Sequence, residues 1–460
     1  MYQDLSFMNV PLPEDILKLK IYGDYAGAQK MIHYFLEEKD IPQALRKRLE
    51  IEQEVIGVMG GNEYPFTYDE ALEIMKSHLR DFKKEELDHL KEIGAADWIY
   101  VDGEVHFQRR FYENLIKTRP DFAKRVIVEN PENNKENNLN QKLLNENIHY
   151  MKEHGGRTVR THIRSTIKVK KEFEEVGRKV RVHLPIPKVY EQVSHVEIHA
   201  SNPEITYIAP FDAPQRTVYF ETELKENQEF MVDYSFDYHV NYVELDPDKV
   251  SKEQPDFCLE EQAPHIVFTP YLRELRDELA GDETNPIILA RRFYDFVTTK
   301  VMYSFMREYF TIECIPEYCA INLKGDCGVQ ALLFITLCRM SGIPARWQSG
   351  LYATKYYTGC HDWAQFYVAP YGWVFADPSF GGSAWREGDK ERWNYYFGNL
   401  DIFRMPANSE IQKEFMPEKK WLRIDPIDNQ RGEFEYEDHG LRFSQVDVSQ
   451  ELISMEDIEK

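Results

Sequence analysis

The sequence predicts a mixed α+β protein built from several domains. Three observations support this fold class: helical periodicity at the start, alternating apolar and polar residues in the middle, and renewed helical signals after a proline-rich junction near Pro255 and Pro264. The 460 residues are about three times the length of a typical domain. Hydrophobic residues make up 42% of the chain, which is enough to fill more than one core.

The first predicted domain, residues 1–129, is a mainly helical region with a small hairpin. Thr67 and Glu70 fit a capping box, in which each side chain satisfies a backbone N–H at the start of a helix. Asp102-Gly103 suits a tight turn between two short strands over residues 98–107. Residues 130–156 begin with an Asn-rich polar run that contains few apolar residues, so we expect a polar linker there.

Beyond the linker, the hydrophobic period changes from that of a helix to that of a strand. Several alternating segments separated by Pro, Gly and Asn predict an antiparallel β-sandwich-like domain over residues 157–262. Helical and strand signals then predict an α+β core over residues 263–405. The tail, residues 406–460, holds 14 acidic and 7 basic residues, and we expect an acidic extension that wraps the surface or is partly loose.

Charge and hydropathy exclude several classes of function. The net charge of −23 argues against nucleic-acid partners and anionic membranes, because both need clustered positive charge. No stretch approaches the roughly 20 apolar residues that span a bilayer, and the start lacks the features of a secretory signal. Six cysteines are too few for a disulfide scaffold. We therefore expect a soluble cytoplasmic protein. The sequence does not indicate its oligomeric state.

The stretch 324–346 contains the strongest chemical signal. Asp326 is placed to cap a buried helix, and Cys327 then falls in its first turn. A thiol there faces unpaired N–H groups and the positive end of the helix dipole, which favours the thiolate, the nucleophilic form. Cys338, deep in the same helix, fits a structural role instead.

A nucleophilic cysteine needs a base and a group that orients the base. His361 lies on a predicted strand, and a turn leads to a return strand that ends at Asp377. Adjacent strands of a hairpin can bring Asp377 beside the His361 ring. Asp362 is nearer in sequence, but strand alternation turns it to the opposite face from His361.

Three motifs occur in this order: GDCGVQALLFITLCRMSGIPAR, HDWAQFYV and GWVFADPSF. Together they resemble the transglutaminase-like superfamily, in its bacterial type, over roughly residues 265–400. The resemblance implies a papain-like core in which Cys327 is the nucleophile, His361 the general base and then acid, and Asp377 the orienting carboxylate. It also implies a second oxyanion donor upstream of the cysteine, for which Tyr303 is preferred over Tyr309 and Asn322.

The expected function is therefore that of a cysteine enzyme that cleaves or transfers acyl groups at amide bonds of peptides or proteins through a thioester. The alternative is a non-catalytic scaffold that binds peptides or proteins with a transglutaminase-like core. Trp363 and Trp385 are candidates for the wall of a substrate groove, with further aromatic residues at 393–396. No cofactor or metal is expected, because Cys314 and Cys319 lack a second pair and no calcium loop is present.

Overall fold

The N-terminal region is mainly helical, as predicted, in a computed structural model that describes residues 4–127 and 131–458. The capping box at Thr67 and Glu70 is confirmed. The hairpin is confirmed as well, and a short third strand joins it in the order β1-β3-β2. The elements are α1 (Glu14–Ile21), α2 (Tyr25–Glu37), α3 (Gln43–Val58), β1 (Phe66–Thr67), α4 (Tyr68–His78), α5 (Lys84–Glu92), β2 (Trp98–Val101), β3 (Glu104–Phe107), α6 (Phe111–Thr118) and α7 (Pro120–Ala123).

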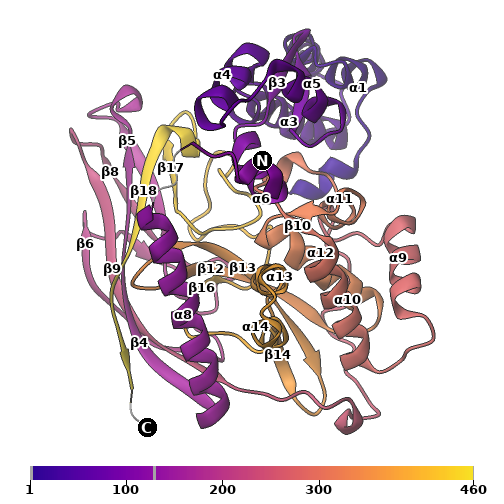
Figure 1. Cartoon of the computed structure of the whole chain (residues 1–460). Helices are drawn as coiled ribbons and strands as arrows, with labels where there is room; N and C mark the ends of the chain where they lie inside the picture. The colour runs from indigo at the N-terminus through magenta and orange to yellow at the C-terminus, as the bar shows by residue number, and fades with distance from the viewer. Residues whose placement is uncertain (1–3, 128–130, 459–460) are drawn as a thin grey trace.

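The segment predicted as a polar linker instead forms the long helix α8 (Pro131–His154); Asn130 lies outside the described residues. In Figure 1, α8 runs between the large β-sheets and the helices of the core. Lys152 near its end forms an ion pair with Glu391 of the core at 2.6 Å. Leu144, Ile148 and Met151 bury one side of the helix, so three apolar residues at helical spacing were enough to anchor a polar sequence.

The predicted sandwich is present, and the C-terminal tail completes it. One sheet has the order β17-β5-β8-β7 and the other β18-β4-β9-β6. Phe230 of the second sheet packs against Phe220 and Phe434 of the first, with ring centroids 5.7 and 5.5 Å apart. The strands are β4 (Gly156–Val169), β5 (Lys179–Pro185), β6 (Val193–Asn202), β7 (Tyr207–Ile208), β8 (Thr217–Glu223), β9 (Glu229–Asn241), β17 (Glu433–Tyr436) and β18 (Val446–Asp457).

Of the two alternatives expected for the acidic tail, a partly loose extension is wrong for residues 446–457, which form a paired strand. Strand β18 pairs antiparallel with almost the whole length of β4, and β17 pairs with β5 (Figure 1). Asp447 and Glu451 of β18 are exposed and alternate with half-buried residues, and Glu456 and Asp457 are both exposed at its end. The net negative charge of the tail is therefore compatible with strand pairing.

The α+β core follows the sandwich and consists of a five-stranded antiparallel sheet with helices packed on it. The strand order is β15-β14-β13-β12-β16, and α12 packs against β12 and β13. Its elements are α9 (Pro270–Ala280), α10 (Pro286–Lys300), β10 (Met302–Tyr303), α11 (Ile315–Asn322), β11 (Lys324–Gly325), α12 (Cys327–Met340), β12 (Ala345–Ala353), β13 (Thr358–Val368), β14 (Gly372–Ala376), α13 (Pro378–Glu387), α14 (Lys390–Tyr395), β15 (Phe397–Gly398) and β16 (Arg404–Asn408). No helix in the described ranges is both long enough and apolar enough to cross a bilayer.

Candidate active site

Cys327 is the first residue of α12, as the sequence predicted. The Asp326 carboxylate caps the helix by accepting a hydrogen bond from the Val329 N–H at 3.2 Å. The Tyr309 hydroxyl donates to the same carboxylate oxygen at 2.5 Å. Cys327 is 9% exposed, so its thiol is nearly enclosed by the core. A buried helix start thus presents the sulfur together with the unpaired N–H groups of its first turn.

His361 and Asp377 are brought together by β13 and by the end of β14. His361 Nε2 lies 2.7 Å from Asp377 Oδ2, and both residues are buried. The other carboxylate oxygen, Oδ1, accepts the Phe380 N–H at 2.9 Å and so caps α13. This cap fixes the carboxylate, which in turn fixes the plane of the imidazole. With Nε2 engaged, Nδ1 is the ring nitrogen that is left for a thiol.

A buried arginine, which the sequence analysis did not single out, shares the Asp377 carboxylate. Arg404, at the start of β16, forms ion pairs with Asp377 Oδ2 at 2.9 Å and with Asp401 Oδ2 at 2.5 Å. Its guanidinium lies over the Phe380 ring, 4.4 Å from the centroid. Because Arg404 comes after the last recognisable motif, its sequence position carries no signal for this role.

The Cys327 thiol contacts Asp362 rather than His361. Sγ donates to Asp362 Oδ2 over 3.3 Å, and Gln430 Nε2 donates to Oδ1 of the same carboxyl group at 2.6 Å. No hydrogen bond joins Cys327 to His361 within residues 4–127 and 131–458. Strand alternation does place Asp362 and the His361 ring on opposite faces of β13. The face that carries Asp362 is the one that meets the start of α12, where Cys327 lies. The sequence analysis missed this contact.

Electrostatics at the thiol oppose the prediction of a thiolate. Burial raises the pKa of Cys327 well above its usual value, and the carboxyl groups of Asp362 and Asp326 raise it further. Burial and the neighbouring Asp428 raise the pKa of Asp362 as well, so this group tends to keep its proton. Burial and the two carboxyl groups act against the helix dipole, which is worth at most about 2 kcal/mol, and the pKa of Cys327 is raised. The resting thiol is neutral.

The imidazole is neutral as well. Burial lowers the pKa of His361, the Asp377 carboxylate raises it, and Arg404 lowers it again. Arg404 therefore cancels part of the stabilisation that Asp377 offers to an imidazolium. The directions of the two pKa shifts therefore favour the neutral form of both the Cys327 thiol and the His361 imidazole.

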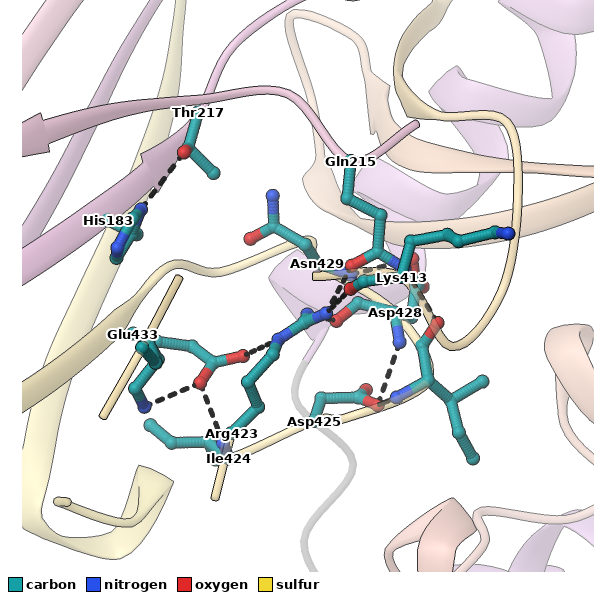
Figure 2. A network of polar contacts seen from close by, with 12 residues as sticks. His183, Gln215, Thr217, Lys413, Arg423, Ile424, Asp425, Asp428, Asn429 and Glu433 are labelled. Carbon is teal, nitrogen blue, oxygen red and sulfur yellow. Dashed lines mark hydrogen bonds and ion pairs between the residues drawn. The ribbon is translucent and has the colours of Figure 1, made fainter. Parts of the chain in front are cut away.

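The C-terminal segment before β17 closes the site on the side of Asp362. Figure 2 shows Arg423 between Glu433 and the loop of Asp425, Asp428 and Asn429. The Asp425 carboxylate accepts the Ile427 and Asp428 N–H groups at 3.1 and 3.0 Å, which holds this loop in a tight turn. Through this network, Asp428 lies next to Asp362, and the Gln430 side chain donates a hydrogen bond to the Asp362 carboxyl group.

Two adjoining cavities open onto the site. One, of about 510 Å³, is lined by His361, and the other, of about 340 Å³, is lined by Cys327. Tyr303, Tyr357 and Cys360 line both cavities and so connect them. Helix α6 and helix α8 supply part of the walls, although both lie outside the core in sequence.

Among the predicted oxyanion donors, Tyr303 has the best placement. Burial raises the pKa of Tyr303 well above its usual value, so its hydroxyl remains a donor. Tyr309 is committed to Asp326, and the exposed Asn322 donates to the Tyr318 carbonyl at 2.8 Å. Lys117 lies 5.1 Å from the centroid of the Tyr303 ring.

The two tryptophans predicted for a substrate groove do not line either cavity. Trp363 shares a face of β13 with His361, with ring centroids 6.1 Å apart, but it is fully buried and donates its indole N–H to Gln348 at 2.8 Å. Trp385 is 39% exposed and packs against Trp393, with centroids 4.6 Å apart. The prediction of a wall formed by Trp363 and Trp385 is therefore wrong for these cavities.

Comparison with known proteins finds a family model that matches part of the core. Residues 273–378 match the family described as "Transglutaminase-like superfamily". No curated protein matches the chain. A solved structure described as "a Putative Cysteine Protease from Cytophaga hutchinsonii" is similar, with 15% identity and a TM-score of 0.40 over 66% of this chain and 92% of the other. The periplasmic domain of TgpA from Pseudomonas aeruginosa is similar with 13% identity and a TM-score of 0.29, over 54% and 95% of the two chains. Residues 273–378, which contain Cys327, His361 and Asp377, match the model of the transglutaminase-like superfamily, the family that the sequence motifs resemble.

Proposed function

We propose that the chain is a Cys-His-Asp enzyme that acts at amide bonds of peptides or proteins. The proposal rests on one observation: His361 Nε2 lies 2.7 Å from Asp377 Oδ2, and both residues are buried. His361 belongs to β13, and the helix that begins at Cys327 packs against this strand. A buried imidazole fixed by a carboxylate, and a thiol at the start of a helix that packs on the same strand, supply the three groups that acyl transfer uses.

The reaction begins when the thiol turns from Asp362 to His361. Nδ1 of the neutral imidazole takes the thiol proton while Sγ attacks the carbonyl carbon of the amide. The tetrahedral oxyanion receives hydrogen bonds from the Cys327 N–H and the Tyr303 hydroxyl. The imidazolium, held by Asp377, then gives its proton to the departing amine, and the C–N bond breaks to leave a thioester on Cys327.

The second half of the reaction restores the enzyme. Water or another amine attacks the thioester carbonyl, and neutral His361 takes the proton of the attacking group. The C–S bond breaks, the proton passes from His361 to the sulfur, and the product is a carboxylic acid or a new amide. Because burial keeps the imidazole neutral, His361 is available as a base in both steps.

The contact between the Cys327 thiol and Asp362 supports a second candidate, a scaffold that binds peptides without turnover. If the thiol stays on Asp362 when a peptide binds, no nucleophile is formed. The two candidates therefore differ in whether His361 ever receives the thiol proton.

Turnover of a complex peptide mixture tests the proposal. The full chain is incubated with the mixture in H₂¹⁸O, with and without a dansylated alkylamine, and products are identified by mass spectrometry. Hydrolysis adds ¹⁸O to new C-termini, whereas transfer adds the amine. We expect product with the wild type and with Cys314→Ala, a cysteine outside both cavities, and none with Cys327→Ala or His361→Ala. A folded wild type that forms no product overturns the enzyme proposal and favours the scaffold.

A further inference from the structure

The cavity beside His361 brings together cations from two distant segments. Lys117 comes from α6 in the N-terminal region, and Arg386 comes from the last turn of α13. Neither side chain forms an ion pair with a carboxylate anywhere in the described part of the chain. Arg110, from the start of α6, lies close enough to lower the pKa of Lys117.

Other cations at the site are paired. Arg404 forms ion pairs with Asp377 and Asp401. Arg392 forms an ion pair with Glu387, the acidic residue that lines this cavity. The Ser383 hydroxyl also donates to Glu387. Glu387 also raises the pKa of Arg386, and Arg392 lies 3.9 Å from Asp389 as well. Three cations, Lys117, Arg386 and Arg392, line the cavity against the single carboxylate of Glu387, so its lining is positive.

The unpaired cations crowd one another. The pKa of Lys117 is lowered by burial first and then by Arg110 and Arg386, while burial lowers the pKa of Arg386 and Glu387 raises it. Both residues remain exposed at the mouth of the cavity, where an anion would relieve the repulsion between their charges. The whole chain has a net charge of −23, so a cluster of positive charge at this cavity has the opposite sign to the rest of the molecule.

Lys117 lies beside Tyr303, a residue that connects the cavity of His361 to the cavity of Cys327. Its ammonium lies 5.1 Å from the ring centroid of Tyr303 and 5.0 Å from that of Phe305. The backbone of Phe305 exchanges two hydrogen bonds with the Asn114 side chain, at 3.0 and 2.7 Å, which fixes α6 on the core. Since Tyr303 lines both cavities, an anion bound by Lys117 lies at the junction that leads to Cys327.

We propose that the cavity lined by Lys117 and Arg386 binds a carboxylate of the substrate, so that the site selects acidic peptides. The choice of a peptide carboxylate rests on the proposed function; the attraction of an anion does not. The carboxylate can belong to a Glu or Asp side chain or to a C-terminus, and these two sources are distinguished below. An arginine fork and a lysine ammonium together suit the two oxygens of such a group.

The first test measures attraction of an anion at the thiol without turnover. Rates of Cys327 alkylation by iodoacetate and by iodoacetamide are compared by peptide mass spectrometry at low salt. We expect the double variant Lys117→Ala/Arg386→Ala to slow iodoacetate by at least about threefold and to leave iodoacetamide within about 1.5-fold. Lys124→Ala, an exposed cation of the same region, serves as the matched control and should change neither rate. Equal effects on both reagents, or none, overturn the proposal.

The second test identifies the source of the carboxylate. Four pools of N-acetylated pentapeptides, with Glu or Gln at the centre and a free acid or amide at the C-terminus, compete with iodoacetamide for wild-type Cys327. Protection by both Glu pools supports a side-chain carboxylate, and protection by both free-acid pools supports a C-terminal one. Equal protection by all four pools, or by none, overturns selection of acidic peptides. Because neither readout needs turnover, this result is independent of whether the enzyme proposal holds.

Discussion

Replacement of Asp362 by Asn should make Cys327 more reactive. In the wild type, the thiol and the Asp362 carboxyl group lie 3.3 Å apart, and the carboxyl group raises the pKa of Cys327. Two full charges at that distance interact by about 5 kcal/mol at an effective dielectric constant of about 20. This is an upper bound near neutral pH, because Asp362 itself tends to keep its proton there.

Even a fraction of that interaction is measurable. A fall of one unit in the pKa of Cys327 gives about ten times more thiolate at neutral pH. Each thiolate is a weaker nucleophile when its pKa is lower, so labelling by iodoacetamide should accelerate about threefold to fourfold per unit. The assay is the rate of Cys327 carbamidomethylation across pH 6–10, followed by peptide mass spectrometry.

The neighbouring acid provides a control of opposite sign. Asp428 raises the pKa of Asp362, so Asp428→Asn should leave Asp362 more often ionised and Cys327 less reactive. Both variants remove one buried carboxyl group, and their thermal unfolding identifies any general loss of structure. If Asp362→Asn labels no faster than the wild type while its fold is intact, the direct charge effect of Asp362 on the thiol is refuted.

Three further predictions concern packing, buried charge and pH. Gly328→Ala should destabilise the chain by about 1–3 kcal/mol in urea unfolding, because a Cβ there would lie 2.3 Å from Tyr309 Oη and 2.7 Å from Asp362 Oδ2. Gly61→Ala, whose Cβ would meet nothing within 4 Å, should have little effect. Arg404→Met should lower the free energy of unfolding by about 3–5 kcal/mol, because it leaves two buried carboxylates without their cation; a loss below about 1 kcal/mol would contradict this. Burial lowers the pKa of His265 to about 3, so between pH 6.5 and pH 3 the unfolded chain binds a proton that the folded chain does not, and stability falls as the pH falls. His265→Leu should therefore lose about 2 kcal/mol less than the wild type between pH 7 and pH 5 in urea titrations, and an identical loss in both proteins would show that His265 is protonated in the fold.

Local signals in the sequence predicted local structure well. The cap of Asp326 on the helix of Cys327 is confirmed, because short polar side chains at a helix start act within a few residues. The approach of His361 to Asp377 also followed from a hairpin, in which chain direction and turn length set the geometry. The roles of these residues in catalysis remain predictions.

Long-range features could not be predicted in the same way. Arg404 and Gln430 reach the site from segments beyond the motifs, and no periodicity indicates which distant chain will supply a partner. Helix α8 was missed because its polar composition dominates a short apolar stripe. Strand β18 was missed because its acidic residues obscured the alternation that pairs it with β4.

Strand β18, which pairs with β4, lies near the end of the described chain, so it is synthesised after the rest of the site. The ribosome makes Cys327, His361 and Asp377 well before it makes Asp428, Gln430 and β18. Until the last segment emerges, the nascent chain exposes the unpaired edge of β4, and Asp362 lacks the Gln430 amide. A prematurely terminated product would carry Cys327 without the Gln430 contact to Asp362, and with an open sheet edge. The surroundings of Cys327 are therefore complete only in a chain that has been translated as far as β18.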